Sequence, residues 1–200
     1  MRIGTKSVLF GAHCFFLHPW FVAWAWWKLY SFPWDPRLWV AFFVHDLGYW
    51  GMQNMDGDDE GELHPYFGAI IMRNLFDRTG SYWFKFTLYH SRFLAKKLNE
   101  QFSPLCVADK LAICLTPAWL YLPLVNLTGE IKEYMATSIQ HSNTKHAFMN
   151  LDQTSQKLWH TSMVKYLLSW VEEHKEGKQD NWTSISSKKD PNPSVNGVWQ

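Results

Sequence analysis

Cysteine is scarce in this 200-residue chain, and neither sign of charge is in excess. The three cysteines, Cys14, Cys106 and Cys114, are widely spaced and form no Cys-x-x-Cys pair. We therefore expect reduced core thiols, no disulfides and a cytoplasmic location. Lys and Arg number 19 against 18 Asp and Glu, so the net charge creates no strong field for nucleic acid. We expect no sequence-specific nucleic-acid binding.

The alternation of polar and apolar residues that marks β-strands is also sparse, whereas apolar residues recur at helical spacing. The sequence therefore predicts an all-α fold, with one domain over residues 1–176 and a polar, disordered tail over residues 177–200. Prolines at helix starts and glycines between helices suggest the boundaries. The expected helices cover residues 7–17, 19–30, 37–46, 64–76, 81–90, 103–111, 118–140 and 158–173.

Aromatic residues make up 18% of the chain and include 13 tryptophans. Two windows, residues 7–27 and 111–129, contain no Asp, Glu, Lys or Arg and are long enough to cross a bilayer. Histidines, prolines and polar residues interrupt both windows, so we expect no stable membrane span. Most of the rings in the first helices are expected to lie in a buried core.

A histidine and an aspartate, His45 and Asp46, stand side by side at the end of an apolar helix. Such neighbours offer one divalent metal both a nitrogen and a carboxylate ligand. Other ligand-type residues lie on or beside apolar helices, at successive gaps of 27, 18, 26 and 19 residues. Each gap is about one helix and a loop, which is how helical bundles build interior metal sites. The full set is His18, His45, Asp46, His64, His90 and Asp109.

This order of residues resembles the H...HD...D signature of the HD-domain metal-dependent phosphohydrolase superfamily, an all-helical fold, across His18, His45-Asp46 and Asp109. The helix opening at His64-Pro65 with Gly68, then His90, and the segment Val107-Ala108-Asp109-Lys110 are similar to the HD-GYP branch and other two-metal HD proteins. The resemblance covers about residues 13–115. It implies a helical bundle with the metal site in its core.

The resemblance further implies a dinuclear site in which Asp46 bridges two metals. His18, His45 and Asp109 would hold one metal, and His64 and His90 the other. The chain departs from the HD-GYP branch because Ser91 and Arg92 follow His90 and the GYP motif is absent, so specificity for cyclic di-GMP is not expected. A glutamate three residues after Asp46, found in single-metal nucleotidases of the superfamily, is also absent.

His13 is the alternative to His18 as the first ligand. The two are five residues apart, about 140° around a continuous helix, so both should not reach one metal. The small apolar residues Val22 and Ala23 after His18 match the family pattern and favour His18.

Two basic residues could contact a phosphate. Arg92 could bind it in a bidentate manner, and Lys110 could neutralise a phosphoryl oxygen, although a surface charge or an ion pair would also explain each. With Asp46, they are the expected catalytic residues.

The leading hypothesis is a metal-dependent phosphohydrolase, a phosphomonoesterase or phosphodiesterase. It would act on a small phosphorylated substrate, with a nucleotide favoured, through a metal-activated water. One or two divalent transition metals (Mn, Fe, Ni or Co) would suit the ligands. A second hypothesis is an HD-fold di-iron oxygenase of the myo-inositol oxygenase type, whose ligand set is similar. A third is a membrane-associated or binding protein whose aromatic helices contact lipid. A homo-oligomer is compatible with each.

Overall fold

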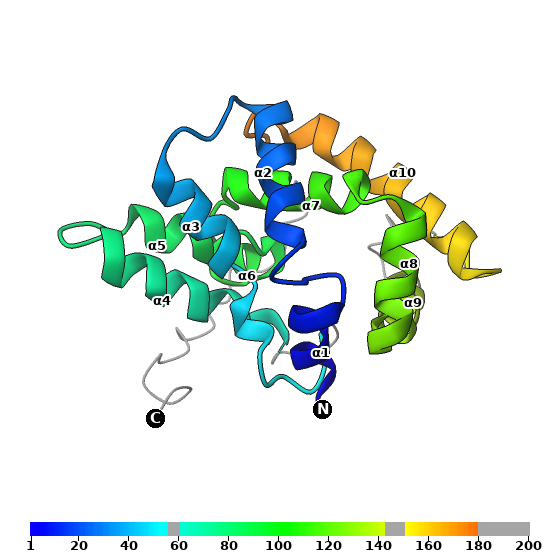
Figure 1. Ribbon diagram of the computed structural model, residues 1–200. Helices are drawn as coiled ribbons and strands as arrows, with labels where there is room; N and C mark the ends of the chain where they lie inside the picture. Colours follow the sequence, from blue (N-terminus) through cyan, green and yellow to red (C-terminus); the bar gives the residue numbers. More distant parts are fainter. Residues whose placement is uncertain (56–60, 143–150, 180–200) are drawn as a thin grey trace.

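Helices make up all the regular structure in the part of the chain that the computed structural model describes, residues 1–55, 61–142 and 151–179 (Figure 1). The all-α expectation is confirmed for these residues. The α-helices are α1 (Ile3–Phe10), α2 (His18–Leu29), α3 (Pro36–Val44), α4 (Pro65–Phe76), α5 (Tyr82–Leu88), α6 (Arg92–Lys97), α7 (Pro104–Leu115), α8 (Ala118–Thr128), α9 (Glu130–Ser142) and α10 (Gln156–His174). Two short 3₁₀ helices, η1 (Leu47–Tyr49) and η2 (Gly61–Leu63), lie between α3 and α4.

The predicted helix starts at prolines agree with the structure. Pro19, Pro36, Pro65 and Pro104 each lie in the first turn of a helix, where the missing N–H removes no helical hydrogen bond. Asp35 strengthens the start of α3, since its side chain accepts a hydrogen bond from the backbone N–H two residues later.

Other boundaries differ from the prediction. The first helix begins at Ile3 and ends before Gly11, so it starts four residues earlier than the expected range of 7–17 and shares only residues 7–10 with it. The single helix expected over 118–140 is two helices, because Gly129 adopts the left-handed conformation, with φ of 90°, and ends α8. The short helix α6 was not predicted. Residues 180–200 of the predicted tail lie outside the described residues.

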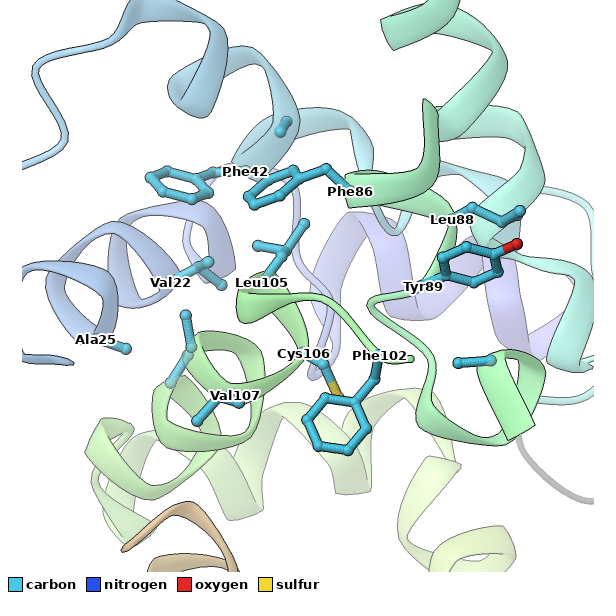
Figure 2. Packing of buried hydrophobic residues seen from close by; sticks show 14 of the residues in the cluster. Val22, Ala25, Phe42, Phe86, Leu88, Tyr89, Phe102, Leu105, Cys106 and Val107 are labelled. Carbon is cyan, nitrogen blue, oxygen red and sulfur yellow. The ribbon is translucent and has the colours of Figure 1, made fainter. Parts of the chain in front are cut away.

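The core forms around α7. Helix α2 packs on one side of α7 and α10 on another, α3 lies against both α2 and α4, and α5 packs against α4 (Figure 1). Figure 2 shows Val22 of α2, Phe42 of α3, Phe86 of α5 and Leu105 of α7 meeting at the centre of this cluster. These apolar contacts hold the ends of α2, α3 and α5 beside the middle of α7, where the site residues lie.

Length and hydropathy identify no single helix that could cross a membrane within the described part of the chain. Helices α7 and α8 pass the same test only as a pair, and they are bent by 101° at the break between them.

Candidate metal centre

Six buried histidine and aspartate side chains converge from different parts of the chain. None of these six residues is more than 7% exposed. His18 opens α2, His45 and Asp46 follow the last residue of α3, His64 precedes α4, His90 follows α5, and Asp109 lies within α7. Residues separated by up to 91 positions in the sequence therefore face one another in the core.

The six side chains form two adjacent groups that can each hold a metal ion. The first contains His18, His45, Asp46 and Asp109, and the second contains Asp46, His64 and His90. Within each group the ligand atoms all lie within 4.8 Å of one another. Asp46 is the residue that the two groups share.

The two carboxylate oxygens of Asp46 face different groups. Its Oδ2 lies 3.1 Å from His45 Nε2 and 3.4 Å from His18 Nε2. Its Oδ1 lies 3.3 Å from His90 Nε2 and 3.7 Å from His64 Nε2. The first group is completed by Asp109, whose Oδ1 lies 3.0 Å from His18 Nε2. This is the arrangement that a carboxylate bridging two ions requires.

Backbone carbonyls fix the tautomer of three of the histidines in the same way. The Nδ1 atoms of His45, His64 and His90 lie 2.9, 2.7 and 2.7 Å from the carbonyl oxygens of the residues three positions earlier. A carbonyl can only accept a hydrogen bond, so each Nδ1 donates its proton. In the neutral imidazole the Nε2 lone pair is then left for a metal, as is usual for ligating histidines.

The polar atoms at the centre fit a cation. His45 Nε2 and Asp46 Oδ2 are buried and have no hydrogen-bond partner among the described residues, although they approach one another to 3.1 Å. The Nε2 atoms of His64 and His90 face each other at 3.1 Å, and both rings donate through Nδ1. Two lone pairs at this distance repel unless a positive charge lies beside them. An ion with bonds of about 2.1 Å sets neighbouring ligand atoms about 3 Å apart, close to these distances.

Two glycines bring the ligand-bearing segments close together. A Cβ atom on Gly48 would lie 1.9 Å from the carbonyl oxygen of His64, and one on Gly68 would lie 2.3 Å from that of Val44. Any side chain at either position would separate α4 from the end of α3. The close approach of these segments places His64 beside Asp46.

The pKa values of the histidines and aspartates in the centre depend strongly on one another. Burial raises the pKa of both Asp46 and Asp109, yet the neighbouring histidines, and Lys110 for Asp109, hold each carboxyl pKa well below its ordinary value. Burial and His90 lower the pKa of His64, so that ring is neutral, as a metal ligand must be. Burial also lowers the pKa of His45, but the carboxylates of Asp46 and Asp109 raise it to about 10. In the metal-free site His45 therefore carries a proton that a metal has to displace.

His13, the alternative first ligand, lies beside the centre in a different cluster. Its Nδ1 is 2.9 Å from Ser7 Oγ and 3.7 Å from Oε1 of Glu130, and its ring is 5.7 Å from that of His18. Of these two histidines, the structure brings His18 within reach of both aspartates. Burial lowers the pKa of His13, but Asp46 and Glu130 raise it to about 9. His13 thus forms a charged pair with Glu130.

Glu130 and Tyr49 are neighbours of the centre that the sequence did not reveal. Glu130 is fully buried and opens α9. The only local signal was an acidic residue directly after an uncharged run. The ring of Tyr49 stacks on that of His64, with centroids 4.0 Å apart and planes 12° apart. It thereby helps to orient the ligand together with the hydrogen bond that His64 Nδ1 donates to the carbonyl of Gly61.

The two basic residues proposed to contact phosphate lie in different surroundings. Lys110 Nζ is 3.0 Å from Oδ2 of Asp109, and its side chain is 27% exposed, so it lies at the rim of the centre. The buried guanidinium of Arg92 donates to the hydroxyl of Tyr166 and lies over the ring of Trp170, both on α10. Arg92 therefore anchors α10, and its phosphate-binding role stays a prediction.

A surface cavity of about 550 Å³ lies away from the centre. It is lined by residues that follow α2, open α3, and connect α4 to α5, including Arg37 and Trp83, and none of the six ligand-type residues contributes to it. The guanidinium of Arg37 lies over the Trp83 ring and pairs with Asp35, so its charge is already satisfied.

Fold and site together define an all-α protein with a buried His/Asp centre that can hold metal, which suggests a metal-dependent enzyme. Comparison of the chain with protein-family models, curated proteins and solved structures finds no match in any of the three. The resemblance to HD domains therefore rests on the residues and their arrangement alone.

Proposed function

We propose that this chain is a metal-dependent phosphohydrolase of the HD-domain type, with Asp46 bridging two metal positions. The observation that carries the proposal is that Asp46 directs one carboxylate oxygen to each of two adjacent ligand groups. Three of the histidines also have their Nδ1 protons held by backbone carbonyls, which leaves Nε2 as the ligand atom. The shared carboxylate is typical of paired metal sites, and the held Nδ1 protons are what ligating histidines usually show.

The chain's own residues have distinct parts in this proposal. His18, His45 and Asp109 would hold one ion and His64 and His90 the other, with Asp46 common to both. Divalent ions bound there would lower the pKa of a water and neutralise charge on phosphoryl oxygens. Lys110, at the rim, would attract and orient the substrate phosphate. Burial of the ligands keeps bulk water away and strengthens these electrostatic contacts.

The ligand chemistry narrows the choice of metal ion and of substrate class. Four imidazoles and two carboxylates suit Mn, Fe, Ni or Co better than Mg or Ca, which prefer oxygen ligands. A small phosphate ester, with a nucleotide favoured, is the proposed substrate class. Lys110 pairs with Asp109 in the structure; with Asp109 bound to a metal ion, the Lys110 ammonium would be able to pair with a phosphate group at this rim.

A di-iron oxygenase of the myo-inositol oxygenase type is the second candidate. The observation that favours it is the mostly histidine ligand set in the buried core, which would hold a redox-active metal away from water. The same six residues would serve both reactions, so metal content alone does not separate them.

The test combines elemental analysis with an activity screen on the full chain. Nucleoside mono-, di- and triphosphates and cyclic nucleotides would be offered with added manganese to the wild type and to Asp46→Asn. The matched control is Glu130→Gln, an isosteric change at another buried carboxylate, outside the two groups. We expect Asp46→Asn to lose metal and activity while Glu130→Gln keeps both.

Two results would overturn the assignment. If Asp46→Asn kept its metal and its phosphatase activity, Asp46 would not be a bridging ligand. If the wild type contained two irons, consumed dioxygen with an organic substrate and hydrolysed none of the phosphates, the oxygenase would replace the hydrolase.

A further inference from the structure

Exposed aromatic side chains gather on the outer side of α2 and on the segments that flank it. Trp20, Trp24 and Trp27 are spaced by four and three residues, so they lie on one side of the helix, and they are 56, 43 and 57% exposed. Phe16 before the helix and Trp34 after it are 73 and 83% exposed. We name these five side chains the aromatic face. The expected burial of the rings in this region is wrong for them.

Ring contacts make the aromatic face continuous with the neighbouring segments. Phe32 joins Trp27 to Trp34, with centroid distances of 5.7 and 4.5 Å. Trp20 contacts Phe43 of α3 at 5.7 Å. In Figure 1, α2 and the segment leading to α3 form an outer edge of the molecule. The rings therefore form one surface instead of scattered exposed residues.

The opposite side of α2 makes the contacts of the helix with the core and with the metal centre. Val22, Ala23 and Ala25 are buried in the core, and His18 reaches the metal centre from the first turn. The fold buries only about half of each tryptophan on the outer side. Five large rings in water cost free energy unless they meet a partner.

The chemistry of the aromatic face points to one kind of partner. Every large hydrophobic side chain exposed between residues 10 and 34 is aromatic, whereas Leu and Ile appear among the exposed residues elsewhere. Tryptophan and tyrosine are the side chains enriched at membrane–water interfaces, where an apolar ring and a polar N–H or O–H are both satisfied. Protein–protein interfaces are also rich in tryptophan, so the charge near the face has to separate a membrane from a second copy of the chain.

Up to residue 34, which ends the face, the sequence carries charge of one sign, although Arg2 and Lys6 belong to the α1 segment and only Lys28 lies on α2. Residues 1–34 contain Arg2, Lys6 and Lys28 and no Asp or Glu. Lys28 Nζ lies 5.2 Å from the centre of the Trp24 ring, within the face itself. The first acidic residue, Asp35, pairs with Arg37 at 2.7 Å. An aromatic surface with a lysine among its rings is complementary to anionic phospholipid headgroups over an acyl layer.

We propose that the aromatic face binds peripherally to the surface of an anionic phospholipid membrane, with α2 lying parallel to it. The indole and phenyl rings enter the boundary between headgroups and acyl chains, and Lys28 contacts the headgroup phosphates. This inference does not depend on the proposed hydrolase activity, because it uses the side of α2 that faces away from His18 and the core.

The test is flotation of the full chain with vesicles of phosphatidylcholine alone and of phosphatidylcholine mixed with phosphatidylserine. We expect the wild type to float with the mixed vesicles and weakly with the neutral ones. In Trp27→Ser/Trp34→Ser, vesicle affinity should fall by roughly tenfold because two rings no longer leave water. The matched control is Trp119→Ser on α8, an equally exposed tryptophan at 76% outside the face, which should bind as the wild type does.

Several outcomes would overturn this proposal. They are no flotation of the wild type, equal loss in the Trp119→Ser control, or a wild-type dimer in solution that the double variant converts to a monomer. The last would mean that a second copy covers the face. Trp34→Ser alone, at the most exposed ring of the face, repeats the test if the double variant unfolds. Asp46→Asn should keep vesicle binding, so failure of the hydrolase proposal is distinguishable from failure of this one.

Discussion

The buried carboxylate of Glu130 gives a prediction whose size follows from its contacts. Its Oε2 accepts hydrogen bonds from the backbone N–H of Ala12 at 3.0 Å and the hydroxyl of Thr128 at 2.6 Å. Its Oε1 accepts one from the hydroxyl of Tyr134 at 3.2 Å and lies 3.7 Å from Nδ1 of His13. Glu130→Gln keeps an acceptor oxygen and the shape of the side chain but removes the negative charge opposite His13.

We expect Glu130→Gln to lose less unfolding free energy than the complete removal of one partner from a buried ion pair. Removing one partner of a buried ion pair costs about 3 to 5 kcal/mol, because the other charge is left without compensation. Here His13 is partly exposed and the glutamine retains part of the hydrogen bonding, so we expect about 2 kcal/mol. At about 2 to 4 °C per kcal/mol for a chain of this size, the unfolding midpoint falls by about 4 to 8 °C.

The loss of unfolding free energy in Glu130→Gln also depends on pH. The pKa of His13 is raised from 6.5 to about 9, so its contribution to stability is complete below pH 6.5 and disappears as the pH rises through 9. Burial raises the pKa of Glu130, but His13 lowers it below 4.5 overall, so its contribution is present above pH 4.5 and is lost on further acidification. The wild type and Glu130→Gln should differ most between pH 4.5 and 6.5.

Urea unfolding at about pH 6 and about pH 10 measures both effects. The control is Glu100→Gln, which breaks the exposed pair with Lys85 and should change the unfolding free energy by less than about 1 kcal/mol at either pH. An equal loss in Glu130→Gln at both pH values would refute the ion pair and leave a packing effect as the explanation.

Three further predictions concern the metal centre. Gly68→Ala should lower the unfolding free energy by about 1 to 3 kcal/mol, because its Cβ would meet the carbonyl oxygen of Val44. Urea unfolding measures this loss, and elemental analysis should show that the metal content falls as well. Metal affinity should rise with pH below 10, because the ion displaces a proton from His45. Calorimetry in buffers of different ionisation enthalpy measures the proton released on metal binding. If no proton is released, the raised pKa of His45 is contradicted. Lys110→Met should raise KM for the phosphate substrate in steady-state assays while elemental analysis finds the metal content unchanged; loss of metal would instead give Lys110 a role in holding Asp109.

The ligand-type residues could be predicted because they share a recognisable setting. His45-Asp46 ends an apolar helix, and His64, His90 and Asp109 follow at intervals of about one helix and a loop. Their convergence then required only that the helices pack in a bundle. The roles of these residues in catalysis stay predictions, since the structure bears on their positions alone.

Longer-range features could not be predicted from local patterns. Glu130 looks like an ordinary helix-opening residue, and its partner Ala12 is 118 positions away in the sequence. The break at Gly129 depends on a left-handed backbone conformation that a glycine allows but does not require. The exposure of Trp27 and Trp34 depends on which side of α2 the core occupies, which composition does not fix.

The shared carboxylate also sets an order for filling the two metal positions. Among the described residues, the position with Asp109 has two carboxylates, whereas the position with His64 and His90 has only the second oxygen of Asp46 as an anionic ligand. An ion in the first position withdraws charge from Asp46 and repels a second dication. We therefore expect stepwise occupancy, with a tightly held first ion and a second that exchanges readily. Protein purified without added metal would then carry one equivalent, and a second equivalent would restore full activity.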